Sequence, residues 1–293
     1  MNIIDIPTIS IVIPNYNCGA TIGRTLKSLV DQDYPALEII VVDGGSTDNS
    51  LEVIRQYQSH IRWWVSEKDR GQAHAINKGI EQASGLIVNW LCSDDCLSQG
   101  TLQRVGLEFA EHNDIDIVAG ACRLIYEKEP SRNRIEQPSE QFLSLMPCCN
   151  AIAQPSCFYR RSLLKREPPI DETFNYAMDF ELWNYFCHSG ARWLFIPDVL
   201  SEYHFSGMNK TSKGGKKATF EFERVYWRYT CERIPATFWH RLLRYPLERL
   251  RRRYPGPLFG FLIYYPWQCL MILILSPFYG FYRMRWMNWV EIG

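Results

Sequence analysis

Two adjacent carboxylates, Asp94 and Asp95, follow a mostly apolar run over residues 87–91 after two intervening residues. Like charges about 4 Å apart repel by roughly 1 kcal/mol in water and by about 4 kcal/mol near a protein surface. A divalent cation would offset this repulsion, because Mg²⁺ binds one or two protein carboxylates and completes its shell with water and substrate phosphates. The alternative is a solvated turn or a helix cap, in which aspartate is also common.

The carboxylates belong to a series of polar clusters that follow apolar runs in the first part of the chain. The runs cover residues 9–14, 37–42, 61–65 and 86–91, and the clusters read PNYN, DGGSTD, SEKD and CSDD. Segments with helical periodicity lie between them, at 21–34, 49–57 and 71–85, the first with Thr21 as its expected N-cap. This alternation predicts a mainly parallel sheet with helices on both faces. Because ligands bind at the carboxyl ends of such strands, the polar clusters should meet at one edge.

Two common phosphate-binding loops are absent from these strand ends. No G-x-G-x-x-G stands after an expected strand and no G-x-x-x-x-G-K-[ST] occurs, which argues against a dinucleotide-binding fold and a P-loop NTPase. A cation held by Asp94 and Asp95, either Mg²⁺ or Mn²⁺, is therefore the expected means of binding phosphate.

The overall composition is that of a globular protein without a bias toward polyanions. The 293 residues include 32 basic and 32 acidic side chains, so the formal net charge is zero and no nucleic-acid partner is expected. The ten cysteines are scattered and mostly lie in apolar runs, which favours free thiols in a reducing compartment. The amino-terminal residues lack the pattern of a secretory signal, and we expect cytoplasmic chemistry.

Four segments together resemble the nucleotide-sugar-binding half of family 2 glycosyltransferases with the GT-A fold. They are SIVIPNYN (10–17), SLVDQDYPALEIIVVDGGSTDNS (28–50), SEKDRGQAHAINKGI (66–80) and ASGLIVNWLCSDD (83–95). QPSCFYRRSLL (154–164) and NYAMDFELWNYF (175–186) resemble the acceptor side of the family, so the likeness extends to about His204. The resemblance implies an α/β fold of the GT-A (Rossmann-like) type and transfer of a sugar from a nucleoside diphosphate donor, with a UDP-sugar expected.

The resemblance also implies roles for residues near the donor. Those expected to contact the nucleotide sugar are Pro14, Tyr16, Asn17, Asp43, Asn77 and Asp94. Asp43 is the expected nucleoside contact, with capping of the following turn as the alternative. Many relatives carry a second acid directly after that aspartate, where this chain has Gly44, so the selection of the base stays open. Asp69 and Arg70 lie in a loop near the pocket, although solvated charges explain them almost as well.

A metal and a catalytic base complete the predicted site. The resemblance assigns Asp94 and Asp95 to the metal and places His204 near the metal or the diphosphate, with ordinary strand surface as the alternative for His204. It assigns Asp179 as the base, because an acceptor hydroxyl is a poor nucleophile until a carboxylate removes its proton. The alternatives are that Asp179 only complements the dipole of the helix that begins near it, or that Glu181 is the base.

The second half of the catalytic region should form the acceptor cleft. A helix is expected over residues 101–111, a strand over 114–127, and cleft walls over 139–161, where Gln154, Pro155 and Ser156 match the family. Trp183 is expected in the core, and Tyr185 in the core or in a sugar platform. The Gly- and Lys-rich segment 207–219 is expected to be a mobile loop, and such loops often close over substrates. Its lysines are candidates for contact with the diphosphate, and a solvated loop explains them equally well.

The C-terminal region joins a basic segment to an uncharged one. Residues 241–253 hold six arginines and one glutamate, and residues 254–282 hold no charged side chain. Pro257, Pro266 and Pro277 interrupt the uncharged segment and leave 267–276 unbroken, which is shorter than the roughly 20 residues that span a bilayer. We expect a re-entrant hairpin or interfacial helices beside anionic lipid. The alternative is a pair of helices packed on the catalytic domain.

These observations predict a division into domains and an activity. Residues 1–215 should form the GT-A domain, with a donor half (1–98) and an acceptor half (99–215), and residues 216–293 a helical membrane-associating region. The expected activity is inverting, metal-dependent transfer of a single sugar to a glycan or lipid-linked glycan in surface polysaccharide assembly, at the inner face of the plasma membrane. The alternatives are a polyprenyl-phosphate acceptor and a non-catalytic sugar-nucleotide-binding protein.

Overall fold

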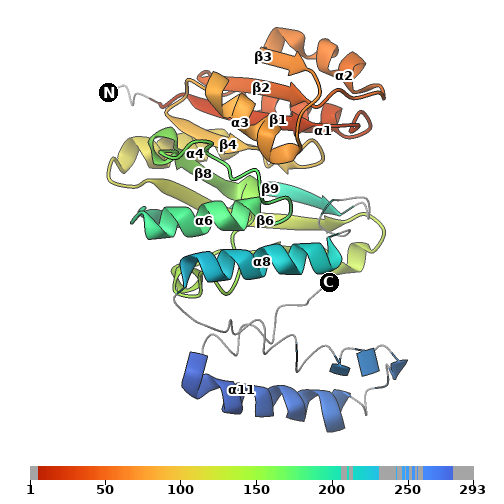
Figure 1. Ribbon diagram of the computed structural model, residues 1–293. Coiled ribbons are helices and arrows are strands. Elements are labelled where there is room, and N and C mark those ends of the chain that lie inside the picture. Colours follow the sequence, from red (N-terminus) through yellow and green to blue (C-terminus); the bar gives the residue numbers. More distant parts are fainter. Residues whose placement is uncertain are drawn as a thin grey trace. The chain divides into compact units, whose positions relative to one another are not determined.

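A computed structural model of the chain shows how the predicted elements assemble (Figure 1). It describes residues 6–205, 210, 214–230, 242, 246–247, 249–250, 253–254, 256 and 260–279. The chain divides into two compact units, one covering 1–140 and 151–213 and the other covering 141–150 and 214–293. A division therefore falls after Lys213, and the short segment 141–150 groups with the C-terminal residues.

The first unit alternates strands and helices along the chain, as the sequence predicts for its first part. Its strands are β1 (Ile9–Asn15), β2 (Leu37–Asp43), β3 (Ile61–Ser66), β4 (Ile87–Trp90), β5 (Cys96–Leu97), β6 (Ile117–Tyr126), β7 (Arg134–Glu136), β8 (Cys157–Arg160) and β9 (Trp193–Phe205). Its α-helices are α1 (Ile22–Val30), α2 (Ser50–Gln56), α3 (Gln72–Gln82), α4 (Thr101–Glu111) and α6 (Met178–His188). The short helix α5 (Glu140–Leu143) stands at the division between the units.

The sheet is parallel in its first half and mixed in its second. Its strand order is β3-β2-β1-β4-β8-β6-β9-β5, with β7 paired to β6, and the pairings from β3 to β4 are all parallel. β8 then runs antiparallel to both β4 and β6, while β6 and β9 are parallel. The prediction of a mainly parallel sheet is therefore right only for the first half. The direction of β8 depends on its pairing with β4 and β6, which lie far from it in the sequence, so the local apolar pattern does not predict it.

Helices cover both faces of the parallel half, as predicted. On one face, Ile11 of β1 joins a buried cluster with Leu26 of α1 and Leu102 of α4. On the other face, α3 approaches Val12 so closely that a Cβ at Gly79 would lie 2.3 Å from a Val12 methyl carbon. Glycine at position 79 thus lets the helix press directly on the strand.

On the face covered by α3, stacked aromatic rings also connect the sheet to α6. Trp90 of β4 stands beside Val12 in the sheet register. Its ring stacks on that of Trp183 at a centroid distance of 6.0 Å, and Trp183 is fully buried. The prediction that Trp183 is a core residue is confirmed.

Helix boundaries agree closely with the periodicity of the sequence. The predicted helix over 101–111 is α4, and α1 begins one residue after Thr21. The Thr21 hydroxyl does not cap that helix, because it donates to the Cys18 carbonyl 3.3 Å away. The carboxyl ends of β1, β2 and β4 lie in register at one edge, which brings the predicted polar clusters together.

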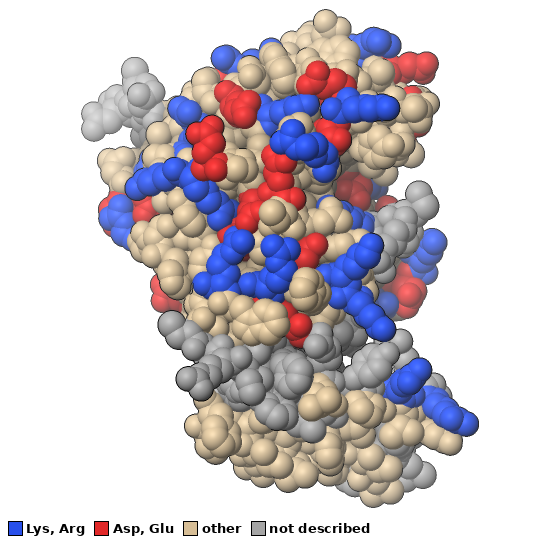
Figure 2. Space-filling view, viewed as in Figure 1, with Lys and Arg blue, Asp and Glu red and all other residues tan. Residues whose placement is uncertain are grey.

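The described part of the second unit is helical and rich in exposed apolar side chains. It contains α8 (Gly215–Tyr229), a π-helical turn over Gly260–Tyr264 and the apolar helix α11 (Tyr265–Tyr279). Leu273 and Phe278 of α11 are 68% and 77% exposed, and the surface that carries this helix shows few charges (Figure 2). No helix in the described part of the chain has both the length and the hydropathy needed to span a bilayer.

Candidate active site

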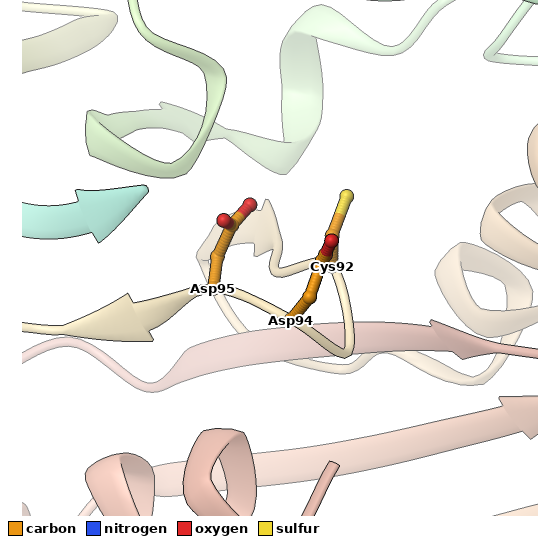
Figure 3. Close-up of side chains that lie close together, drawn as sticks. All are labelled: Cys92, Asp94 and Asp95. Atoms are coloured by element: carbon orange, nitrogen blue, oxygen red, sulfur yellow. The ribbon is translucent and has the colours of Figure 1, made fainter. Parts of the chain in front are cut away.

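Three potential metal ligands meet in the turn between β4 and β5. The turn is closed by a hydrogen bond from the Asp95 amide to the Cys92 carbonyl, 3.0 Å long. Ligand atoms of Cys92, Asp94 and Asp95 all lie within 4.8 Å of one another, and the three side chains project toward the same side of the turn (Figure 3). The structure thus brings together the predicted pair of aspartates and adds a thiol to it.

Asp95 is the most deeply buried member of this cluster. It is 1% exposed, and its Oδ1 atom has no hydrogen-bond partner among the described residues. Burial first, and the neighbouring Asp94 second, raise the pKa of its carboxyl well above the ordinary value, while the backbone of His204 lowers it. A buried carboxylate oxygen without a donor is costly, and a bound cation would both neutralise and coordinate it. The residues present therefore fit a divalent ion.

Asp94 and Cys92 are half-buried and complete the cluster. The Asp94 carbonyl accepts a hydrogen bond from Arg24 Nη2 at 3.1 Å. Burial raises the pKa of the Cys92 thiol, as do the nearby Asp95 and Asp94 carboxylates, whereas Lys210 and a hydrogen bond from Gln72 act in the opposite direction. The main chain of Asp95 is fixed by Thr25, whose hydroxyl donates to the Asp95 carbonyl at 2.8 Å.

His204 lies near Asp95 but outside the cluster of described metal ligands. It is 8% exposed on β9, with its ring nitrogens 3.5 Å from a Glu127 oxygen and 3.8 Å from a Glu202 oxygen. Burial and the charge of Arg24 lower the pKa of its imidazole, although both glutamates raise it. His204 is thus buried strand rather than exposed strand surface, and its role near the metal or diphosphate stays a prediction.

Asp43 is the last residue of β2, and its carboxylate accepts hydrogen bonds from the turn that follows. Its buried carboxylate accepts bonds from Asn15 Nδ2 (2.7 Å), Ser66 Oγ (2.6 Å), and the Ser46 amide (2.9 Å) and hydroxyl (2.5 Å). Burial alone would raise the pKa of Asp43, but these donors outweigh it and lower the pKa below its ordinary value. The capping role considered for Asp43 is therefore present, and its contact with a nucleoside stays a prediction.

The segment after β1 is tied to the same turn. Pro14 is buried, and its carbonyl accepts the Ser93 hydroxyl at 2.7 Å, which links β1 to the metal-ligand turn. Asn17 has a positive φ of 51° and accepts the Thr47 amide on its side-chain oxygen at 2.8 Å. Tyr16 is 63% exposed. The three residues predicted to line the nucleotide pocket thus lie together at the carboxyl edge of the sheet.

A carboxylate from another loop fills the space beside Gly44. A Cβ built at Gly44 would lie 2.6 Å from Asp69 Oδ2. The other oxygen of Asp69 accepts the Gly71 amide at 2.8 Å, which fixes its orientation. The space directly beside Gly44 is therefore occupied by an acid from the loop after β3.

Asn77 faces the segment 170–172 with both ends of its side-chain amide. It donates to the Ile170 carbonyl at 2.9 Å and accepts the Ile170 amide at 2.8 Å. Glu172 in the same segment forms a bidentate pair with Arg70, with the closest contact at 2.9 Å. Arg70 thus forms an ion pair within the protein. A contact between Asn77 and the nucleotide stays a prediction.

The two candidate bases on α6 have different surroundings. Asp179 is half-buried in the first turn, where its Oδ1 accepts the Phe180 amide at 2.7 Å. Glu181 is fully buried and held by Arg166 in a bidentate ion pair, with one contact of 2.7 Å. Because both oxygens of Glu181 are bound by that guanidinium, the geometry favours Asp179 over Glu181 as the base.

The three residues predicted for the acceptor cleft, Gln154, Pro155 and Ser156, form hydrogen bonds to β4 and β6, and their place in a cleft stays a prediction. Gln154 donates to the Asn89 side chain at 3.0 Å and to the Trp90 carbonyl at 2.7 Å. The Pro155 carbonyl accepts from Asn89 at 3.1 Å, and Ser156 donates to the Ala121 carbonyl at 2.8 Å. Tyr185 is half-buried beneath the Arg166 guanidinium, 4.5 Å from the ring centre. Of the predicted closing loop, 207–219, residues 215–219 instead form the start of α8, and 207–209 and 211–213 lie outside the described residues.

Sequence reasoning missed the place of Cys92 in this site and the contact of Lys210 with Gln72. The run CSDD contains the cysteine that joins both aspartates, but a lone thiol with no second ligand at zinc-type spacing gives no signal. Lys210 donates to the Gln72 side chain at 2.9 Å, across a sequence separation of 138 residues. No local pattern could predict that contact.

Comparison of the sequence with known proteins gives a consistent result. Residues 10–189 match the model of glycosyl transferase family 2. The PGL/p-HBAD biosynthesis glycosyltransferase of Mycobacterium bovis is 28% identical over 214 residues, which cover 70% of this chain and 80% of the relative. The glycosyltransferase alr2836 of Nostoc is 32% identical over 177 residues, 56% of this chain and 54% of the relative. The chain covers only 54%, 41% and 32% of three such relatives.

Solved structures with the same fold include two in complex with nucleotides. S. aureus TarS in complex with UDP superposes with a TM-score of 0.61 at 19% identity, covering 96% of this chain and 88% of TarS. The mannosyltransferase PcManGT from Pyrobaculum calidifontis, in complex with GDP-Man and Mn²⁺, gives a TM-score of 0.60 at 17% identity, covering 96% and 85%. At this level of identity the likeness shows a shared fold.

Proposed function

Because the chain belongs to glycosyl transferase family 2, we propose that it moves a single sugar from a nucleoside diphosphate donor to a glycan or glycolipid acceptor, with the help of a divalent cation. The observation that carries this proposal is the cluster of Cys92, Asp94 and Asp95 at the carboxyl edge of the sheet. The buried Oδ1 atom of Asp95 has no hydrogen-bond donor among the described residues, as expected of an oxygen that coordinates a cation.

The two aspartates would hold the ion, Mg²⁺ or Mn²⁺, beside the donor diphosphate. When bound, such an ion acts as a Lewis acid for the negative charge that appears on the leaving nucleoside diphosphate. The protein fixes the turn in advance, since Thr25 and Arg24 bind the carbonyl groups of Asp95 and Asp94. Preorganised groups of this kind need no rearrangement during the reaction.

Asp179 is proposed to remove the proton of the acceptor hydroxyl. Its carboxylate is half-buried in the first turn of α6 and holds one backbone amide on Oδ1. A single base on the acceptor side supports direct attack on the anomeric carbon from the face opposite the diphosphate, and hence inversion. General-base catalysis of this kind contributes about 10²–10⁴-fold in rate.

The donor is proposed to be a UDP-sugar. Proteins of the same fold are known in complex with UDP, with UDP-GlcNAc and with GDP-Man, so the fold accepts either base. In this chain the residues available for selection at the carboxyl edge are Tyr16, Asn17, Asp43 and Asp69. Asp69, in the space beside Gly44, would determine how the base is held.

A lipid-linked acceptor at the inner face of the plasma membrane is proposed from the C-terminal helix. Leu262, Leu273 and Phe278 are each more than half exposed, and the described Arg249 and Arg253 are exposed as well. Apolar side chains beside arginines suit the surface of an anionic membrane. A relative named for PGL/p-HBAD biosynthesis supports a glycolipid product.

A screen of nucleotide sugars for metal-dependent release of the diphosphate tests the activity. We expect release with at least one UDP-sugar, and Asp179→Asn should reduce transfer to a hydroxyl acceptor by about 10²–10⁴-fold. Glu181→Gln is the matched control on the same helix; it should lower stability because it breaks a buried ion pair, while folded protein keeps its transfer rate. Donor binding without any turnover would favour a non-catalytic binding protein instead.

The acceptor class is tested with the same Asp179→Asn variant. A polyprenyl-phosphate acceptor is already anionic and needs no strong base, so the variant would then retain most of its activity. Sedimentation with anionic and neutral vesicles tests the membrane proposal. The full chain should bind anionic vesicles, and Leu273→Glu together with Phe278→Glu should abolish binding; equal recovery in the supernatant with and without vesicles would contradict it.

A further inference from the structure

We propose that Cys92 is a third protein ligand of the divalent cation, and that its sulfur shifts the preference of the site from Mg²⁺ toward Co²⁺ and Zn²⁺. The inference rests on the proposed metal dependence and goes beyond it, since the two aspartates alone would suit Mg²⁺. It concerns which ion this chain selects.

The first observation is the position of the sulfur. The Cys92 Sγ and one oxygen from each of Asp94 and Asp95 lie within 4.8 Å of one another, so one ion placed among them can reach all three. Figure 3 shows the three side chains projecting to the same side of the turn. A second, independent observation is that Asp95 Oδ1 is buried and lacks a hydrogen-bond partner among the described residues.

The third observation is how the sulfur is held. Gln72 Nε2 donates to Cys92 Sγ at 3.2 Å, while the Oε1 atom of Gln72 accepts from Lys210 Nζ at 2.9 Å. An ammonium group can only donate, so Lys210 fixes the Gln72 amide with its NH₂ group toward the sulfur. The sulfur is therefore an acceptor in this arrangement, with a lone pair available on the side of the two aspartates. Partners behind the ligands orient and tune them in metal sites generally.

The contacts of Cys92 argue against a purely structural role. A free cysteine usually serves as a small apolar side chain in the core, as Cys157 does in β8, where it is fully buried. Cys92 is half-buried instead, between two carboxylates and an amide. On coordination its thiol proton passes to solvent, and the sulfur gains a bond to the ion while it keeps the bond from Gln72.

A thiolate changes the order of affinities. Mg²⁺ is a hard ion that prefers oxygen, whereas affinity at mixed sulfur and oxygen sites rises along the first-row series through Co²⁺. We therefore expect the full chain to bind Co²⁺ more tightly than Mg²⁺ by a larger margin than an all-oxygen site would give. Lys210 and Gln72 act as positioning residues for the sulfur.

The test is a titration of the full chain with Co²⁺ in saturating UDP, followed by sulfur-to-cobalt charge-transfer absorption in the near ultraviolet. Wild type should develop this band, and Cys92→Ser should lose it. Cys18→Ser is the control, because Cys18 is also half-buried nearby but its thiol contacts the Tyr16 carbonyl at 3.4 Å and is outside the cluster; it should keep the band. Circular dichroism establishes that each variant is folded.

Calorimetric Kd values for Co²⁺ and Mg²⁺ provide a second measure. Cys92→Ser should reduce the preference for Co²⁺ over Mg²⁺ by about tenfold or more. Cys92→Asp should improve Mg²⁺ binding, and it keeps the test valid if the serine variant does not fold. Gln72→Leu should weaken the band without abolishing it.

The outcomes separate this inference from the proposed function. A band of equal intensity in wild type and Cys92→Ser, or an unchanged metal preference in both Cys92 variants, would overturn the role of the sulfur even if sugar transfer is observed. A thiolate band that depends on Cys92, in a protein that transfers no sugar from any donor, would support this inference and overturn the proposed activity.

Discussion

Two buried acids stand at opposite ends of the parallel sheet and have opposite surroundings. Glu38 is the second residue of β2, and Asp95 lies in the turn beyond the carboxyl end of β4. They are 7% and 1% exposed. Both are buried, and they differ in the donors and charges that surround each carboxyl group.

Glu38 is surrounded by hydrogen-bond donors. Its carboxylate accepts the Ser10 hydroxyl at 2.6 Å, the Ser84 amide at 3.0 Å and the Ser84 hydroxyl, and Arg62 lies 3.1 Å away. Burial would raise the pKa of Glu38, but these donors lower it below the ordinary value. A cavity of about 750 Å³ opens near this edge, with Ser84 in its lining and no acidic or thiol side chain among the lining residues.

Asp95 has the opposite balance. One of its oxygens lacks a donor among the described residues, and burial beside Asp94 raises the pKa of its carboxyl. A buried acid that receives enough donors stabilises the fold, whereas one that lacks them costs stability. The comparison shows that two buried acids of the same sheet have pKa values displaced in opposite directions.

The largest expected effect is the loss of turnover when Asp95 is replaced. Asp95→Asn should lower metal-dependent turnover by about 10³-fold, because the ion supplies several kcal/mol of transition-state stabilisation. The metal-free protein should be as stable as wild type or more so, since a buried charge is removed. Turnover with added Mn²⁺ and urea denaturation without metal measure the two effects; a large loss of stability would show that Asp95 is structural.

The next largest effect is the loss of stability when Glu38 is replaced. Glu38→Gln should lower the free energy of unfolding by about 1–3 kcal/mol, because it weakens the hydrogen bonds from Ser10 and Ser84. Turnover per folded molecule should stay at the wild-type level, since the residue lies at the opposite edge from the metal cluster. Urea denaturation and kinetic assays of the same preparation check this, and a specific loss of kcat would contradict it.

The smallest expected effect is on how stability depends on pH, which should differ in sign between Glu38 and Asp95. The pKa of Glu38 is lowered by folding, so its stabilising contribution is full above the ordinary carboxyl range and is lost as pH falls through the folded pKa. The pKa of Asp95 is raised, so the folded state binds more protons and this group destabilises increasingly as pH rises toward the folded pKa.

Unfolding measured without metal over a series of pH values tests both signs. The stability advantage of wild type over Glu38→Gln should shrink on acidification, whereas wild type should gain stability relative to Asp95→Asn. The same direction of change for both pairs would contradict the contrast between the two acids.

Much of the first half of the fold could be predicted because its signals are local. The runs that became β1 to β4 and the helices between them follow from the spacing of apolar residues, and the helix over 101–111 was predicted to the residue. β8 escaped prediction because four residues, Cys157–Arg160, carry too little pattern to fix their direction. The antiparallel pairing depends on which neighbours β8 meets.

The sequence by itself determined the parallel half of the sheet and the position of the acidic turn after its fourth strand. Both follow from local signals, namely the spacing of apolar residues and the alternation of strands with helices. Only the tertiary structure decided which polar groups meet. It paired Asn77 with Ile170 across 93 residues, enclosed Glu181 with Arg166, placed Asp69 beside Gly44 and brought Lys210 to Gln72. The physical reason is that a side chain's chemistry depends on the donors, charges and solvent around it. In this protein most of these come from segments far away in the chain.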